Sequence, residues 1–67
     1  MSDPKPPRAP ISPEVRAFVI DSLRRTAREH HDRANICAED GVPDEAEFES
    51  QQGDAFDAAA DLLEQTP

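Results

Sequence analysis

The placement of proline and glycine constrains the fold of this chain more than any other feature of its sequence. Residues 14–40 contain neither residue, whereas five of the seven prolines precede this stretch and Gly41 and Pro43 follow it. Proline removes a backbone donor and breaks helix interiors, so a long stretch without it favours one continuous helix. A chain of 67 residues then has room for one small domain only.

The first helix is predicted over residues 13–39. Ser12 can cap the first-turn amides, Pro13 suits the first helical position, and Glu14 complements the positive end of the helix dipole. A stripe recurs at helical spacing along one side and is made of Val19, Leu23, Ala27, His30, Ala34 and Cys37. Phe18 and Ile36 project to a flank beside this stripe, which predicts a second contact surface.

A turn is predicted over residues 40–43, because Gly41 suits a left-handed helix cap and Pro43 cannot continue the helix before it. A second helix is predicted over residues 44–65, and acidic residues in its first turn match the dipole. Its predicted apolar stripe consists of Phe48, Gln52, Ala55, Phe56, Ala59, Leu62 and Leu63. Gly53 interrupts this helix and is expected to allow close packing or a slight bend.

Together these elements predict an all-α fold, a two-helix antiparallel hairpin over residues 12–67. A hairpin of two amphipathic helices covers each stripe on one side only, and ordering the chain costs about 1.5 kcal/mol per residue. We therefore expect the hairpin to dimerise into a four-helix bundle, or to dock on a larger partner. The candidates for the core and the dimer contact are Val19, Leu23, Ala27, Phe48, Phe56, Ala59, Leu62 and Leu63.

Residues 1–11 are predicted to form a disordered, proline-rich arm. Within this arm, Pro7 and Pro10 stand three residues apart beside the basic residues Lys5 and Arg8. This spacing resembles a ligand of SH3-type domains, although such a tetrapeptide also occurs by accident. A flexible arm is the preferred interpretation.

Charge excludes several functions. The formal net charge is −8, and residues 34–67 carry ten acids and no base. Phosphates repel such a surface, so we expect no direct binding to nucleic acid or to an anionic membrane. The longest apolar run, Phe18 to Ile20, is too short to span a bilayer, and the N-terminus lacks a secretory apolar segment. The expected location is the cytoplasm.

Residues that carry chemistry are few. His30 and His31 are adjacent and point about 100° apart on a helix, so they cannot converge on one metal ion. We interpret His30 as a half-buried packing residue with its polar tip satisfied, His31 as a surface residue, and Cys37 as a small buried apolar residue. No catalytic residue, metal ligand or cofactor site is predicted, and the chain is expected not to be an enzyme.

The second helix carries four carboxylates at spacings of 3, 4 and 3, which predicts an acidic line along its outer face: Asp54, Asp57, Asp61 and Glu64. Their separation of about 5–6 Å roughly resembles that of phosphates along a nucleic-acid strand. One hypothesis is a DNA mimic that inhibits a nucleic-acid-binding enzyme or a transcription factor. The simpler interpretation is a solvated face that keeps a small helical protein soluble.

The favoured function is therefore that of a small, acidic, non-enzymatic protein–protein interaction module or regulator, such as an adaptor or accessory factor. Its partner would be a protein, and a basic one if the acidic line takes part. The partner-binding candidates are Phe18, Ile36, Asp54, Asp57, Asp61 and Glu64.

Overall fold

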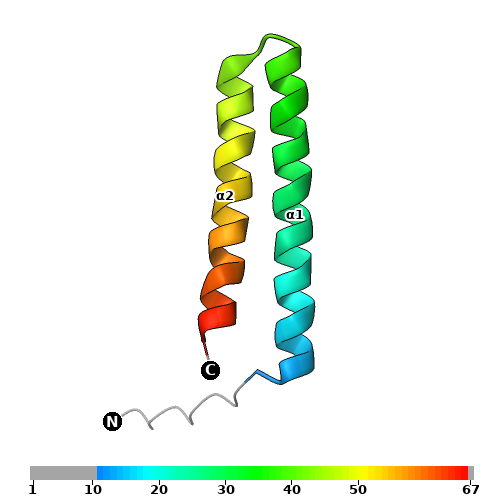
Figure 1. Cartoon of the computed structure of the whole chain (residues 1–67), viewed down its shortest axis with the longest axis vertical. Coiled ribbons are helices and arrows are strands. Elements are labelled where there is room, and N and C mark those ends of the chain that lie inside the picture. The colour runs from blue at the N-terminus through cyan, green and yellow to red at the C-terminus, as the bar shows by residue number, and fades with distance from the viewer. Residues whose placement is uncertain (1–10, 67) are drawn as a thin grey trace, which may run out of the picture.

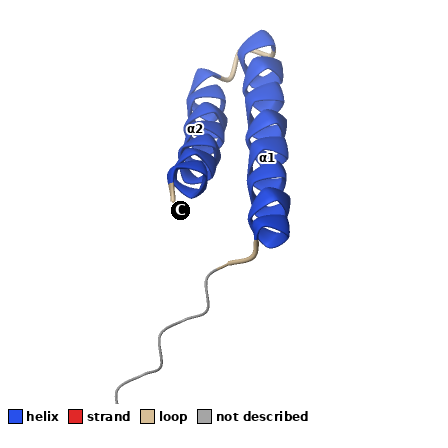
Figure 2. Cartoon of the chain, turned by 60° about the horizontal axis from the view of Figure 1, so that its bottom comes forward, coloured by secondary structure: helices blue, strands red, loops and turns tan. Residues whose placement is uncertain are grey.

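The computed structural model describes residues 11–66 and consists of two long helices packed side by side in opposite directions (Figures 1 and 2). Helix α1 spans Pro13–Glu39 and helix α2 spans Pro43–Gln65. The predicted all-α hairpin is confirmed, and α2 begins one residue earlier than predicted. The proline-rich arm and its Pro7–Pro10 spacing lie outside the described residues.

The start of α1 follows the predicted cap. The hydroxyl of Ser12 accepts a hydrogen bond of 3.2 Å from the backbone amide of Val15, the third helical residue. Pro13 occupies the first helical position, where its missing amide leaves no bond unmade. The local sequence therefore sets where the helix begins, without help from α2.

The turn between the helices is a Schellman motif. Gly41 has a φ of +77°, in the left-handed region that favours glycine. Its amide donates to the carbonyl of Ala38 at 3.3 Å, and the amide of Val42 donates to that of Cys37 at 2.9 Å. The predicted glycine cap is thereby confirmed, and the chain reverses direction within three residues.

Small residues form the contact between the two helices. Among the described residues, the buried ones are Ala27 and Ala34 from α1, and Gly53 and Ala60 from α2. The residues of each pair stand seven apart, which is two helical turns, so each pair forms one line along its helix. Small side chains along both lines allow the two backbones to approach closely.

The predicted stripe of α2 is displaced from this line of contact. Phe48 and Leu62 were expected at the core or a dimer contact, but their exposures of 58% and 66% exclude them from the core of the hairpin. Phe56, Ala59 and Leu63 are half-buried at the edge of the contact. The large side chains are displaced because Gly53 and Ala60 let the helices pack along the small residues instead.

Gly53 shows how tight this contact is. A Cβ added there would lie 2.5 Å from the imidazole of His31 and 3.0 Å from the backbone carbonyl oxygen of Ala27. The helix contains a glycine at this position because α1 occupies the space of a side chain. Of the two roles expected for Gly53, close packing is the one found.

No helix in the described part of the chain is long and apolar enough to cross a membrane.

Candidate functional site

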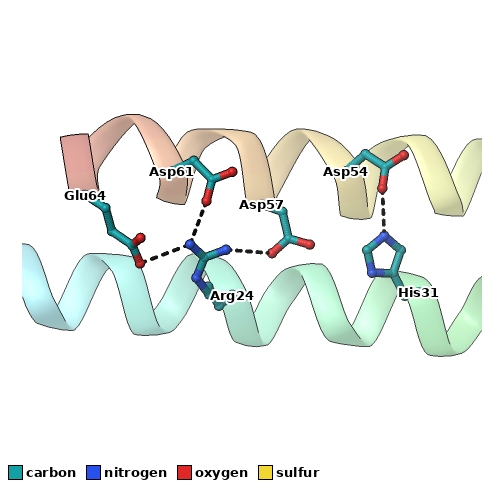
Figure 3. A network of polar contacts seen from close by, with 6 residues as sticks. All are labelled: Arg24, His31, Asp54, Asp57, Asp61 and Glu64. Carbon is teal, nitrogen blue, oxygen red and sulfur yellow. Dashed lines mark hydrogen bonds and ion pairs between the residues drawn. The ribbon is translucent and has the colours of Figure 1, made fainter. Parts of the chain in front are cut away.

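Arg24 of α1 bridges to three carboxylates of α2 on one side of the hairpin (Figure 3). Its Nη2 donates to Oδ1 of Asp61 at 2.7 Å and to Oε1 of Glu64 at 3.0 Å. Its Nη1 donates to Oδ1 of Asp57 at 3.3 Å. One guanidinium thus ties together two turns of the acidic helix, as its planar fork of donors allows.

This arrangement corrects the prediction that the acidic line faces outward. Asp57, Asp61 and Glu64 lie next to α1, where the long side chain of Arg24 reaches them. The prediction failed because the line of contact on α2 is displaced toward these carboxylates. The hydrogen bonds to Asp61 and then Glu64 raise the pKa of Arg24 further above its ordinary value, so its charge is permanent.

The fourth carboxylate of the line also faces α1. Nε2 of His31 lies 3.1 Å from Oδ1 of Asp54 (Figure 3). His31 was expected to be a surface residue, and its side chain is 36% exposed, with its ring reaching toward α2 over Gly53. We call the side of the hairpin that carries Arg24, His31 and their four carboxylates the polar face.

His30 lies on the opposite side of the contact. Its Nδ1 is 2.6 Å from Oε2 of Glu49, and its ring stacks on Phe56 with centroids 5.4 Å apart. The side chain of His30 is 18% exposed. The interpretation of His30 as a half-buried packing residue with a satisfied polar tip is confirmed, and its partners are now identified.

The side of the hairpin that carries His30 and Phe56 is apolar at most positions, and the polar residues among them include Arg33, Glu49 and Gln52. Residues three, four and seven apart share a helix face, which places Phe48, Ala59 and Leu63 beside Phe56 on α2. The same spacing places Val19 and Cys37 beside His30 on α1, with further residues at the edges of this surface. We call the following set the apolar face: Val15, Val19, Cys37, Phe48, Phe56, Ala59 and Leu63, bordered by Phe18, Ile36 and Leu62 on the outer sides of the two helices.

Most of the apolar face is left uncovered by residues 11–66. The large apolar side chains that the structure leaves exposed on the two helices are Val15, Phe18, Ile36, Phe48 and Leu62, and all lie on this face or border it. Phe18, at 72%, is the most exposed of them, and Ile36 is 57% exposed. The two partner-binding candidates of α1 therefore lie along one edge of a larger surface.

Within residues 11–66 no large side chain is fully buried. Leu23, Phe56 and Leu63 pack between the helices but remain partly open to solvent. The hydrophobic effect scales with the apolar area removed from water, so a hairpin that hides mainly alanine and glycine gains little from it. The apolar face is the area that further association can still bury.

The chemistry of Cys37 is that of a protonated thiol. Partial burial raises its pKa, and the negative charges of Glu45, Glu49 and Asp40 raise it further. A thiolate is the nucleophilic form, so a raised pKa lowers the reactivity of this cysteine at neutral pH. The described residues also contain no pocket and no group of three metal-ligating side chains placed around one point.

Comparison of the chain with protein-family models, with curated proteins and with solved structures gives no match.

The sequence reasoning missed the partners of both histidines and of Arg24. A signal for them was present: Ala46, Gly53 and Ala60 recur every seven residues on α2, as Ala27 and Ala34 do on α1. Aligning the two helices on these small residues places the four carboxylates beside α1 and Phe48 away from it.

Proposed function

We propose that this protein is a small, acidic, non-enzymatic interaction module that acts by binding another protein through its apolar face. In cellular terms it would be an adaptor, an accessory factor or a regulator. The proposal makes the uncovered apolar face the functional surface. The proposed function includes no catalytic activity.

The observation that carries this proposal is the contrast between the two faces of the hairpin. On the polar face, Arg24 and His31 hold the carboxylates of α2. On the other face, large side chains such as Phe18, Phe48 and Leu62 stand exposed. Contiguous exposed apolar surface on a small protein marks a place of association, because leaving it in water is unfavourable.

A second copy of this chain is one protein that can bind the apolar face, since homodimerisation covers the face without requiring a further gene product. A third protein would then bind at surfaces that stay outside the dimer. Phe18 and Ile36, at the outer edge of α1, remain the apolar candidates for that contact.

The experiment that tests the module uses the purified full chain over a wide range of concentration. Far-UV circular dichroism reports helix content, sedimentation equilibrium reports mass, and a dye that fluoresces on apolar surfaces reports whether the face is open. We expect association to accompany high helix content, and we expect the dilute chain to lose helix or bind dye. A monomer that stays helical at all concentrations and binds no dye would contradict the proposal.

The alternative is a DNA mimic that acts through the acidic line of α2. The proposal above is preferred because Arg24 offsets part of the charge of Asp57, Asp61 and Glu64, which a mimic would need to present freely. Ionic strength separates the two functions. Binding through many ion pairs weakens steeply with salt, whereas binding through an apolar face does not weaken.

A further inference from the structure

We propose that the apolar face pairs with the same face of a second copy, with both turns at the same end of the resulting four-helix bundle. In this arrangement each α1 lies over the α2 of the partner copy. The inference rests on the proposed function, because it names the occupant of the same surface.

The size of the face fits a stable dimer. The 23 residues of α2 make a helix about 35 Å long, and two helices side by side are about 20 Å wide. Their product is about 700 Å² per copy, close to the roughly 800 Å² per partner that specific interfaces bury. A face of this size needs no larger partner to cover it.

Large side chains occur along the whole apolar face. At the open end of the hairpin the face carries Val15 and Leu63, and at the turn end it carries Phe48. Between them lie the stacked rings of His30 and Phe56. Two such faces that pack against each other can bury large residues along their whole length.

Charge decides between the two symmetric ways of pairing the faces. Helix α1 carries five bases and five acids, whereas α2 carries eight acids and no base. With the turns at opposite ends, a two-fold axis across the helices would lay each α2 on the other α2. With the turns at the same end, the axis runs along the helices and each α2 lies over a neutral α1. Four of the eight acids of each α2 belong to the polar face and lie away from this contact, but the negative net charge of α2 still favours the second arrangement.

A distance measurement between the two turns tests this arrangement. Cys37→Ala removes the chain's one cysteine, and Asp40→Cys in that background places a spin label at the exposed turn. With the turns at the same end, we expect the two labels to lie within about 25 Å of each other, roughly two helix diameters. Turns at opposite ends would separate them by about 40 Å, the length of α1, and that distance would overturn the proposal.

A matched pair of substitutions tests which face is used. Val15→Glu places a charge on the apolar face, and Ala17→Glu places the same charge on the same turn of α1 but toward the polar face. Both positions are exposed in the hairpin, so neither change should unfold it. We expect Val15→Glu to weaken dimerisation at least tenfold and Ala17→Glu to leave it within about twofold, as measured by sedimentation. If the two substitutions weaken dimerisation equally, the proposal is overturned.

The result for the isolated chain also separates this inference from the proposed function. A monomer that is poorly helical or binds the apolar dye would overturn pairing with a second copy, but it would leave a module that needs a different protein. A helical monomer that binds no dye would overturn both.

Discussion

At the scale of single residues, Gly53 is the position where packing opposes local preference. Alanine is favoured over glycine in a helix interior by about 1 kcal/mol, but overpacking costs about 1–3 kcal/mol. The added Cβ would displace the ring of His31 and press on the carbonyl of Ala27. We expect Gly53→Ala to lower the free energy of unfolding by about 1 kcal/mol, measured by urea denaturation at fixed protein concentration.

A second substitution shows whether the imidazole is responsible. In a chain that also carries His31→Ala, the two closest atoms to the new Cβ are gone, and the next closest is the backbone carbonyl oxygen of Ala27 at 3.0 Å. Gly53→Ala should then destabilise less than it does alone. An unchanged cost would place the conflict at the backbone instead.

Arg24 provides a second test among single residues. It contacts three carboxylates of the opposite helix, whereas Arg25 pairs only with Asp21 on its own helix. We expect Arg24→Gln to lower the melting temperature more than Arg25→Gln does, because it also leaves the carboxylates of α2 to repel one another. The difference should shrink in about 1 M salt, where the Debye length falls to about 3 Å. Equal effects in low salt would show that the bridge contributes nothing.

Cys37 predicts a dependence on alkaline pH. Its pKa in the folded protein is raised above the ordinary value of 9.0, chiefly by partial burial. Below that value the thiol is protonated in both states, and above it the unfolded chain ionises first, so stability falls as the pH rises. Urea denaturation at pH 8 and pH 10 should show this loss in the native chain. Cys37→Ala should remove the part of this loss that is due to the thiol. If the variant loses as much stability between pH 8 and pH 10 as the native chain does, the loss comes from other groups.

At the scale of elements, the turn is as important as the helices. Gly41 holds a φ of +77°, which costs other L-residues about 1–2 kcal/mol. Gly41→Ala should therefore lower the free energy of unfolding by about 1 kcal/mol, whereas Gly41→Asn should cost less because asparagine tolerates this region. Thermal denaturation followed by circular dichroism measures both. If alanine and asparagine cost the same, the left-handed cap is not what stabilises the turn.

The limits of the sequence reasoning also lie at this scale. Helix bounds and caps depend on neighbours in the chain, so Ser12, Gly41 and the hairpin itself could be predicted. The packing register depends on how closely two backbones approach, which the pattern of large apolar residues did not reveal. For that reason Phe48 and Leu62 were placed at the core or a dimer contact, and Asp57 and Asp61 on the outside. The sevenfold spacing of small residues was the better guide.

At the scale of the whole molecule, the apolar face and the net charge have opposite effects on association. The apolar face favours association of two copies, while a net charge of −8 on each copy opposes it. The arrangement with each α2 over a neutral α1 reduces the repulsion at the interface. The repulsion between the net charges of the two copies remains. Dimerisation should therefore be driven by apolar burial and limited by long-range charge.

This balance predicts how salt changes the assembly. Raising NaCl from about 20 mM to about 300 mM shortens the Debye length to less than about 10 Å, which screens the repulsion between the copies and leaves apolar burial intact. We expect the dissociation constant of the dimer to fall severalfold over this range, as measured by sedimentation equilibrium, with helix content in the assembled state unchanged. Sodium sulfate at equal ionic strength should strengthen the dimer further, because sulfate also promotes apolar burial. A dimer that weakens with NaCl would instead be held by ion pairs between the copies, and its interface would then include the polar face around Arg24.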